Sequence, residues 1–358
     1  MKAIHQIVAG FTNGDAISNE ALVLRDVFRS WGFKSDIFCE SKRILPELRS
    51  QALDIKTCQS SCLADDVALL HLSIGSAVND IFPSLNCKKA ILYHNITPPH
   101  YFNLINRQTA MDLEKGQRQV AALANVAQVN MADSRFNANE LAPLGYTNVH
   151  VLPLVLDLEK LKASPDRKIL RIYDNDTTNI LFVGRCAPNK KIEDLITAFY
   201  YYHKYVDPNS RLLYVGSFAG TERYYHLLLT QIRELDLSCV HFTGSIPQSH
   251  VNAFYKCADL FLSMSEHEGF CIPVLESMVH NVPVLAYANA AVPETMDGAG
   301  VLFKEKKIEL VAEMMGRMVH DSEFRNAVIK KQKERLARYT GRNLASELRQ
   351  MLDPILRA

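Results

Sequence analysis

The residues best suited to chemistry lie in one short run, residues 268–276, which reads EGFCIPVLE. One carboxylate opens the run at Glu268 and another closes it at Glu276. Between them, Gly269 permits a tight turn, and Pro273 suits the first turn of a helix, where its missing N–H costs nothing. The N-terminus of that helix would offer backbone N–H groups and a positive dipole end to a diphosphate or to sugar hydroxyls.

Each glutamate taken alone also has a simpler interpretation. Glu276 could complement the helix dipole, and Glu268 could lie in a solvated surface loop. The complete string of carboxylate, glycine, aromatic residue, proline and second carboxylate favours a ligand-binding site over both.

A second run, residues 183–191, reads VGRCAPNKK and follows the apolar residues ILF. Arg185 and Lys190 flank a loop that contains Pro188, so both could reach one anion beyond the end of a strand. Negative charge grows on a diphosphate when its bond to a sugar breaks, and fixed cations stabilise that transition state. The alternative is that both side chains are only solvated.

The run EGFCIPVLE resembles the E-x7-E signature of retaining glycosyltransferases of family 4, which have the GT-B architecture of two facing Rossmann-like domains. The resemblance implies that Glu276 binds the ribose hydroxyls of a nucleotide. It also implies that Glu268 and the amides of Gly269, Phe270 and Cys271 position the donor sugar.

The same resemblance assigns the diphosphate to Arg185 and Lys190, with Lys191 in place of Lys190 if the alignment shifts by one residue. Gly184 and Gly216 follow strands of the second half and are expected to line the donor site. The run SEHEGFCIP is similar to that of many mannosyltransferases of bacterial surface polysaccharides, so GDP-mannose is the first choice of donor. UDP- and dTDP-sugars are the alternatives.

In the first half, the turn GFTNGDAISN at residues 10–19 lacks the GxGxxG fingerprint of a nicotinamide-binding fold. Gly14 and Asp15 still precede a helix, and by resemblance this loop touches the donor or the acceptor. Glycine could also serve only the turn itself.

Two further runs of the first half resemble the same family. In HNITPP, the resemblance places His94 near the donor sugar and Asn95 at the cleft. In ADSRFNANEL, it places Ser134 and Arg135 at the cleft, whereas a helix N-cap is the simpler role for the serine. A lone histidine after a strand is more often structural.

These residues need a scaffold, and the apolar pattern supplies an α/β one. Short apolar runs alternate with amphipathic stretches, as in parallel strands joined by crossover helices. Strands are expected at residues 3–9, 34–39, 67–72, 88–93, 129–132 and 149–152, with a helix at 17–31. The second series begins with NILFVG and continues at 211–216, 239–243, 259–263, 283–287 and 300–303. Its helices are expected near 191–206, 221–235, 248–257, 273–280 and 306–320.

The chain of 358 residues is long enough for two domains. We expect an acceptor domain at residues 1–155, a polar linker at 156–178 and a nucleotide-sugar domain at 179–335. By resemblance, a C-terminal helix at about 340–358 packs back on the first domain. Ligands of open α/β sheets bind beyond the carboxyl ends of the strands, where the residues above fall.

Composition limits the partners. The formal charge of +1 argues against nucleic acid, and the eight cysteines form no CxxC pair that would indicate structural zinc. No acidic DxD run lies at a credible site, so we expect no metal and no cofactor besides the nucleotide sugar. The start MKAIHQIVAG lacks the apolar run of a signal peptide, which predicts a cytoplasmic protein.

The C-terminal stretch is basic. It holds Lys330, Lys331, Lys333, Arg335, Arg338, Arg342, Arg349 and Arg357. A solvated helix face is the simpler interpretation, and weak contact with anionic lipid at the inner membrane surface is the alternative.

Together these features predict a retaining, metal-independent hexosyltransferase of polysaccharide biosynthesis. Its acceptor would be a glycan or a polyprenyl-diphosphate-linked glycan. A GT-B-like sugar-nucleotide epimerase and a non-catalytic sugar-nucleotide-binding protein remain the alternatives.

Overall fold

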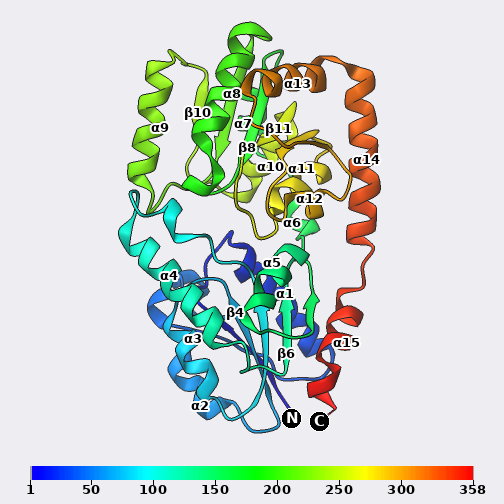
Figure 1. Cartoon of the computed structure of the whole chain (residues 1–358). Helices are drawn as coiled ribbons and strands as arrows, with labels where there is room; N and C mark the ends of the chain where they lie inside the picture. The colour runs from blue at the N-terminus through cyan, green and yellow to red at the C-terminus, as the bar shows by residue number, and fades with distance from the viewer. Residues whose placement is uncertain (1, 358) are drawn as a thin grey trace. The chain divides into compact units, whose positions relative to one another are not determined.

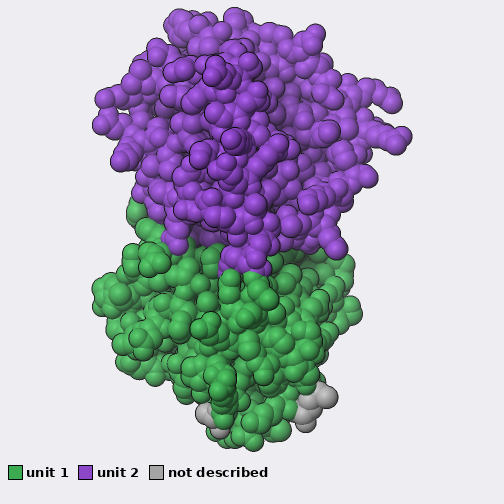
Figure 2. All heavy atoms as spheres, turned by 90° about the vertical axis from the view of Figure 1, so that its right-hand side faces the viewer, with its two compact units in different colours: residues 1–100, 107–155, 343–358 green, residues 101–106, 156–342 purple. Residues whose placement is uncertain are grey.

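The computed structural model describes residues 2–357 and contains two parallel sheets, each flanked by helices (Figure 1). The chain divides into two compact units (Figure 2). Unit 1 comprises Met1–His100, Arg107–Val155 and Asn343–Ala358, and unit 2 comprises Tyr101–Asn106 and Leu156–Arg342. The two-sheet α/β fold expected from the apolar pattern is confirmed.

Unit 1 is built on a seven-stranded sheet of order β3-β2-β1-β4-β5-β6-β7. The strands are β1 (Ile4–Val8), β2 (Ile37–Cys39), β3 (Leu53–Asp54), β4 (Val67–Leu72), β5 (Lys88–Tyr93), β6 (Val129–Ala132) and β7 (Val149–Val151). Its α-helices are α1 (Ala16–Ser30), α2 (Cys58–Ser61), α3 (Ala77–Ile81), α4 (Arg107–Ala122), α5 (Arg135–Leu141) and α15 (Leu344–Leu356). Every strand pair is parallel, so the carboxyl ends of all seven strands lie at one edge.

Helix α1 forms where the sequence supplies both a cap and an apolar stripe. The Asp15 carboxylate accepts a hydrogen bond of 2.9 Å from the Ser18 amide at the N-cap. Leu24 and Phe28, one turn apart, are fully buried against the sheet. The helix ends before Gly32, whose φ of 84° is the left-handed conformation that glycine adopts easily.

Unit 2 is built on a six-stranded sheet of order β10-β9-β8-β11-β12-β13. The strands are β8 (Thr178–Val183), β9 (Ser210–Val215), β10 (Val240–Phe242), β11 (Leu260–Ser263), β12 (Val284–Tyr287) and β13 (Val301–Phe303). Its α-helices are α6 (Leu158–Lys162), α7 (Arg167–Tyr173), α8 (Ile192–Tyr205), α9 (Glu222–Glu234), α10 (Gln248–Cys257), α11 (Ile272–Val279), α12 (Val292–Met296), α13 (Ile308–His320) and α14 (Ser322–Thr340). This sheet is also entirely parallel.

The segment expected to be a polar linker, residues 156–178, is instead structured and groups with unit 2. It contains α6 and α7, each capped by an aspartate: Asp157 accepts from the Lys160 amide and Asp166 from the Lys168 and Ile169 amides. The Asn252 side chain of α10 donates to the carbonyls of Lys160 and Ala163, at 2.8 and 3.0 Å. The charged residues of this segment therefore belong to two short helices at the surface of unit 2, α6 and α7, and not to an unstructured connection.

The last two helices belong to different units. In α14, the buried Gln332 accepts from the Val284 amide at 2.9 Å and donates to the Val282 carbonyl at 2.8 Å, which ties the helix to unit 2. In α15, Leu348, Leu352 and Ile355 join the core of unit 1. In the described part of the chain, no helix has the length and apolar character needed to cross a membrane.

Candidate functional site

Two loops at the carboxyl edge of the unit 2 sheet are joined by hydrogen bonds. One follows β8, the other follows β11, and these strands are neighbours in the sheet. The Glu266 amide donates to the Asn189 carbonyl at 2.8 Å, and the Asn189 side chain donates to the His267 carbonyl at 2.9 Å. Asn189 is 5% exposed, so this buried amide fixes the two loops together. The sequence analysis did not single it out.

That junction brings Lys190 against Glu268. The Lys190 ammonium forms an ion pair with Oε2 of Glu268, and the two side chains are 20% and 9% exposed. The two residues come from runs 78 positions apart in the chain, and they were predicted to serve one ligand. The carboxylate of Glu268 fixes the position of the Lys190 ammonium, which is partly exposed. The ammonium can therefore donate to an anion from a fixed position.

The turn after Glu268 leads directly into α11. Its left-handed residue is Cys271, with φ 74° and ψ 61°, so the unusual backbone lies there and not where the glycine at 269 suggested. Thr295 donates its hydroxyl to the Phe270 carbonyl, and the Ala291 amide donates to the Glu268 carbonyl at 3.2 Å. A non-glycine residue in this conformation costs free energy, which is often accepted at ligand sites. Burial, reinforced by Glu268, raises the pKa of the Cys271 thiol well above its usual range.

Glu276 lies one turn inside α11, as expected. Its Oε2 accepts a hydrogen bond of 2.7 Å from the hydroxyl of Tyr255, a fully buried residue of α10. Burial raises the pKa of Glu276, and the Tyr255 hydrogen bond opposes this rise. The His280 ring stacks on Tyr255, with centroids 4.9 Å apart and planes 2° apart. Glu276 is thus a carboxylate whose orientation is set by a rigid aromatic neighbour.

Gly184 and Gly216 directly follow the adjacent strands β8 and β9 and lie against each other. A Cβ atom added to Gly216 would lie 1.9 Å from the Gly184 carbonyl oxygen. Position 216 therefore needs glycine for close backbone approach, whereas a Cβ at position 184 would lie 3.1 Å from the Phe182 ring. Arg185 follows directly; it is exposed, and its guanidinium donates to the Ala219 carbonyl at 3.4 Å. Of the two predicted diphosphate ligands, Lys190 is held in an ion pair and Arg185 is exposed.

A second group of charges beside this site was missed by the sequence analysis. Lys306 donates to Asp194 at 2.7 Å and to Glu266 at 2.9 Å, and its ammonium lies 4.9 Å from the centre of the Tyr287 ring. Lys191 lies 3.7 Å from Glu266. Burial would raise the pKa of Glu266, but Lys306 and Lys191 outweigh it and lower that pKa. The run SEHE, with Glu266 and Glu268 two residues apart, could have indicated that each carboxylate has a cationic partner.

In unit 1, the loop after β1 borders a cavity of about 210 Å³. It is lined by Ala9, Gly10, Thr12, Asp15, Ile17, Arg43, Ser73 and Ile74. Gly14 has φ 73° and makes the turn before α1. The Asp15 carboxylate at the cavity wall also accepts from the Ser18 hydroxyl at 2.8 Å. The loop therefore combines a helix cap with a concave surface of mixed polar and apolar lining.

The predicted residues that follow β5 and β6 form a second polar group. Asn95, with φ 78°, donates its side-chain amide to Asn137 and to Glu140, each at 2.8 Å. Ser134 caps α5 by accepting from the Asn137 amide at 3.1 Å, and Arg135 is exposed at the first helical position. Burial raises the pKa of Glu140 to about 6. The structure thus gives Ser134 the capping role that was its simpler interpretation.

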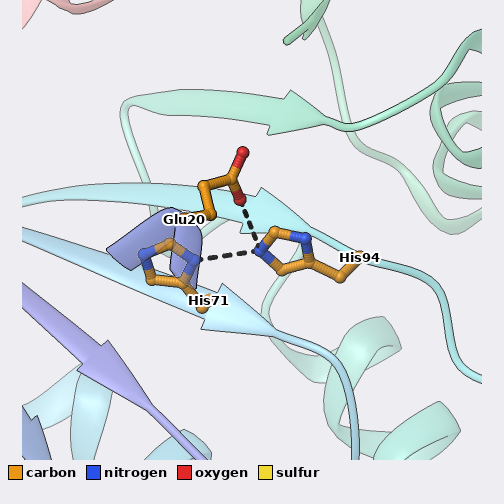
Figure 3. A group of neighbouring side chains, drawn as sticks. All are labelled: Glu20, His71 and His94. Carbon is orange, nitrogen blue, oxygen red and sulfur yellow. Dashed lines mark hydrogen bonds and ion pairs between the residues drawn. The ribbon is translucent and has the colours of Figure 1, made fainter. Parts of the chain in front are cut away.

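His94 lies in the interior of unit 1 (Figure 3). Its side chain is 2% exposed, and both ring nitrogens face buried groups. Nε2 lies 2.9 Å from Nδ1 of His71 and 3.6 Å from Oε2 of Glu20, and Nδ1 lies 3.5 Å from Oδ2 of Asp133. Burial alone would lower the pKa of His94, but Asp133 and Glu20 raise it, whereas burial lowers that of His71 well below its usual range. Donor atoms of Glu20, His71 and His94 lie close enough together to hold a metal ion.

Comparison with known proteins gives this geometry a context. Residues 164–335 match the family model described as glycosyl transferases group 1. Among curated relatives, O-antigen chain mannosyltransferase B of Escherichia coli is 24% identical over 40% of this chain and 38% of its own. Alpha-monoglucosyldiacylglycerol synthase of Streptococcus pneumoniae is 29% identical over 43% of this chain and 40% of its own. The aligned stretch thus spans well under half of each relative's length.

Among solved structures, Anabaena Alr3699/HepE in complex with UDP and glucose superposes with a TM-score of 0.76 at 16% identity, covering 100% of both chains. At that identity the likeness concerns the fold. The protein therefore has the GT-B fold of two Rossmann-like units, and the segment that carries Arg185, Lys190, Glu268 and Glu276 matches the glycosyl transferases group 1 model.

Proposed function

We propose that this protein is a retaining glycosyltransferase that moves a hexose from a nucleotide diphosphate to a glycan acceptor. One observation carries the proposal: the Lys190–Glu268 ion pair stands before α11, with the carboxylate of Glu276 one turn further along. A cation for a diphosphate from the loop after β8 meets a carboxylate for sugar hydroxyls from the loop after β11, and a carboxylate for ribose follows in α11. All three residues lie within the match to glycosyl transferases group 1.

In the proposed site, Arg185 and Lys190 bind the diphosphate. When the glycosidic bond breaks, these fixed cations stabilise the charge on the leaving group, which supports metal independence of the transfer step. Glu268 has two uses: it holds Lys190 and it faces the sugar hydroxyls together with the amides of Gly269, Phe270 and Cys271. Lys190 changes its principal partner from a carboxylate to a phosphate when the donor enters.

The ribose site is proposed at Glu276. Tyr255 donates to Oε2 of this carboxylate, and Oε1 is proposed to accept from the ribose hydroxyls. Burial strengthens hydrogen bonds from neutral hydroxyls to an ionised carboxylate. Gly184 and Gly216 keep the adjacent strand ends free of side chains, as close approach of a nucleotide requires.

We propose GDP-mannose as the donor, with UDP- and dTDP-sugars as alternatives. The relative from Escherichia coli is named a mannosyltransferase, whereas the Anabaena structure contains UDP and glucose. Retention is proposed by front-face departure and attack, without a protein nucleophile.

The acceptor is proposed to be a glycan or a polyprenyl-diphosphate-linked glycan of surface polysaccharide synthesis, held by unit 1. The polar cavity of the loop after β1 and the polar group around Asn95 are its candidate contacts. We also propose peripheral contact of the basic C-terminal stretch with the cytoplasmic membrane face. Arg335 and Arg338 lie 3.5 and 3.0 Å from Asp297, so part of the basic stretch is already paired within the protein.

A thermal-shift panel of nucleoside diphosphates and their sugars tests the donor site, because a ligand that binds only the folded protein raises its melting temperature. GDP and GDP-mannose are expected to give the largest shifts. If no nucleotide shifts the midpoint at millimolar concentration, the donor site is wrong.

Incubation of the protein with donor and acceptor separates the three possible functions. Free nucleoside diphosphate together with a longer glycan supports transfer. An isomerised donor would indicate a sugar-nucleotide epimerase instead. A bound but unchanged donor would indicate a non-catalytic binding protein.

A further inference from the structure

We propose that Glu20, His71 and His94 form a binding site for one divalent transition-metal ion, of which Zn²⁺ fits the donor set best. The three side chains come from α1, from β4 and from the residue after β5, and their donor atoms converge in the interior of unit 1 (Figure 3). All three residues are buried, at 1%, 0% and 8% exposure. Two imidazoles and one carboxylate are a set that zinc binds in proteins.

The spacing of the donor atoms suits such an ion. Nδ1 of His71 and Nε2 of His94 are 2.9 Å apart, Nε2 of His94 and Oε2 of Glu20 are 3.6 Å apart, and all three lie within 4.8 Å of one another. At bonds of about 2.0–2.2 Å, two ligands of a tetrahedral zinc ion lie roughly 3.3–3.6 Å apart. The 3.6 Å separation lies at the upper end of this range, and the two histidine nitrogens, 2.9 Å apart, would move apart by roughly 0.4–0.7 Å on binding.

The hydrogen bonds around His71 fix its tautomer in the form that a metal requires. The side-chain amide of Gln6 donates from Nε2 to the Ala21 carbonyl at 2.8 Å, which identifies Oε1 as the opposite, accepting end. Oε1 of Gln6 lies 2.9 Å from Nε2 of His71, so Nε2 carries the hydrogen. The lone pair of neutral His71 is therefore on Nδ1, the nitrogen that faces His94 and Glu20.

In His94 too, one ring nitrogen faces the proposed metal position and the other faces a hydrogen-bond acceptor. Its Nδ1 faces the carboxylate of Asp133 at 3.5 Å, and Asp133 in turn accepts from the side-chain amide of Asn137. In the ion-free protein, the 2.9 Å contact makes Nε2 of His94 the donor to Nδ1 of His71. A metal ion would displace that hydrogen, as ligand nitrogens must be deprotonated, and the hydrogen on Nδ1 of His94 would face Asp133. Metal-bound histidines in proteins almost always donate their second N–H to a carboxylate, a carbonyl or a similar acceptor. Here both histidines have such an acceptor, Gln6 for one and Asp133 for the other.

Charge supports the same assignment. Glu20 and Asp133 are each 1% exposed and bring two carboxylates into the interior of unit 1. Buried charges are paired or bind metal ions, because an uncompensated one costs several kcal/mol. One divalent cation balances both carboxylates while the two imidazoles stay neutral. This ion would stabilise unit 1; the transfer step proposed for unit 2 depends on its own cations.

Metal binding by the full chain tests the site without donor or acceptor. The protein is dialysed against a chelator and titrated with Co²⁺, whose visible absorption reports tetrahedral ligation, and then with Zn²⁺, followed by metal analysis. We expect one equivalent of either ion per chain and a higher melting temperature with Zn²⁺. Binding of less than one equivalent, or no tetrahedral Co²⁺ spectrum, would overturn the proposal.

Variants locate the ion. Glu20→Gln and His71→Asn are expected to abolish the Co²⁺ spectrum, and Asp133→Asn to weaken affinity by about 10–100-fold, as loss of a partner behind a ligand typically does. His5→Asn is the matched control, because His5 is an equally buried histidine of β1 outside the group. Equal binding by all four variants would mean an adventitious ion only. If a ligand variant fails to fold, Asp133→Asn and the wild-type spectrum still decide the outcome. Lys190→Ala should bind the ion normally, so failure here and failure of the proposed transfer activity are separate results.

Discussion

Lys190 is the residue on which the proposed chemistry depends most directly. It was predicted as a phosphate ligand, and the structure pairs it with Glu268, so it is both positioned and neutralised before any ligand arrives. A residue in this position contributes more to the transition state than to the folded state, because charge on the leaving group grows as the bond breaks.

Lys190→Ala is therefore expected to lower kcat by about 100–1,000-fold, the usual cost of removing one donor to a developing anion. The melting temperature should also fall, because the largely buried Glu268 carboxylate loses its cationic partner, so rates are compared at a temperature where both proteins are folded. Steady-state kinetics with the donor found by thermal shift, beside a melting curve, measures both. Lys191→Ala is the matched control; an unchanged rate in Lys190→Ala with a reduced rate in Lys191→Ala would move the role to the neighbouring lysine.

His280 makes the stability of unit 2 depend on pH. Burial lowers the pKa of its imidazole from 6.5 to about 4. Because this pKa is lower in the folded protein, the unfolded protein binds the proton more readily. The contribution of His280 to folding stability is therefore complete above pH 6.5 and is lost as the pH falls toward 4. We expect the free energy of unfolding to fall by about 2 kcal/mol over this window, after allowance for partial exposure.

His280→Phe should remove the contribution of His280 to that slope, while other buried histidines such as His71 keep theirs. Phenylalanine keeps the stack on Tyr255, and Nε2 of His280 has no hydrogen-bond partner among the described atoms, so little else is lost. Urea unfolding at several pH values measures the effect. An unchanged slope in the variant would show that another group is responsible.

Among the elements, the agreement between sequence and structure follows the strength of the apolar signal. Central strands such as β4 and β8, buried over all or most of their length, were predicted within a residue or two, because parallel strands covered on both faces read as continuous apolar runs. The two-residue strand β3 was missed, since Leu53 is exposed and Asp54 half-buried. Helix α4 was also missed. Gly116 lies inside it because a Cβ there would come within 2.6 Å of the Gly75 amide nitrogen, and a helix glycine weakens the local signal.

The site shows the same division. Residues within one run, such as Glu268 and Glu276, could be predicted together because the helix between them fixes their spacing. The tie between loops through Asn189, the partners of Lys306 and the inward direction of His94 could not, because each depends on contacts between segments distant in sequence. Three-dimensional packing alone determines such pairs.

The junction of β8 and β9 yields a prediction for an element pair. Gly216→Ala would place a methyl group 1.9 Å from the Gly184 carbonyl oxygen, and backbone cannot yield as a flexible side chain can. The strand ends should separate, with a loss of about 1–3 kcal/mol in stability and a weaker thermal shift by nucleotide. Gly10→Ala is the control, because its added methyl would have 4.0 Å to the Arg43 carbonyl oxygen. Equal effects of both substitutions would contradict the close-approach argument.

At the scale of the whole molecule, the chain crosses from unit 2 back to unit 1 before α15, so the C-terminus contributes to the stability of the opposite sheet. Leu352 of α15 is fully buried in the core that contains Ile4 and Leu69. Leu352→Ala should cost about 2–5 kcal/mol, the range for a leucine truncated in a core. Leu104→Ala, with a side chain 77% exposed, is the matched control and should change stability little.

The damage should remain in unit 1, because α15 packs in that core and the proposed nucleotide site is built from residues of unit 2. In Leu352→Ala, the amides of β4 should therefore exchange faster in hydrogen–deuterium exchange, while those of β11 keep their protection. A nucleoside diphosphate should still protect the loop after β11 to the wild-type extent. Loss of protection in β11 as well would mean that the two sheets unfold as one cooperative unit and that the C-terminal helix stabilises the donor site directly.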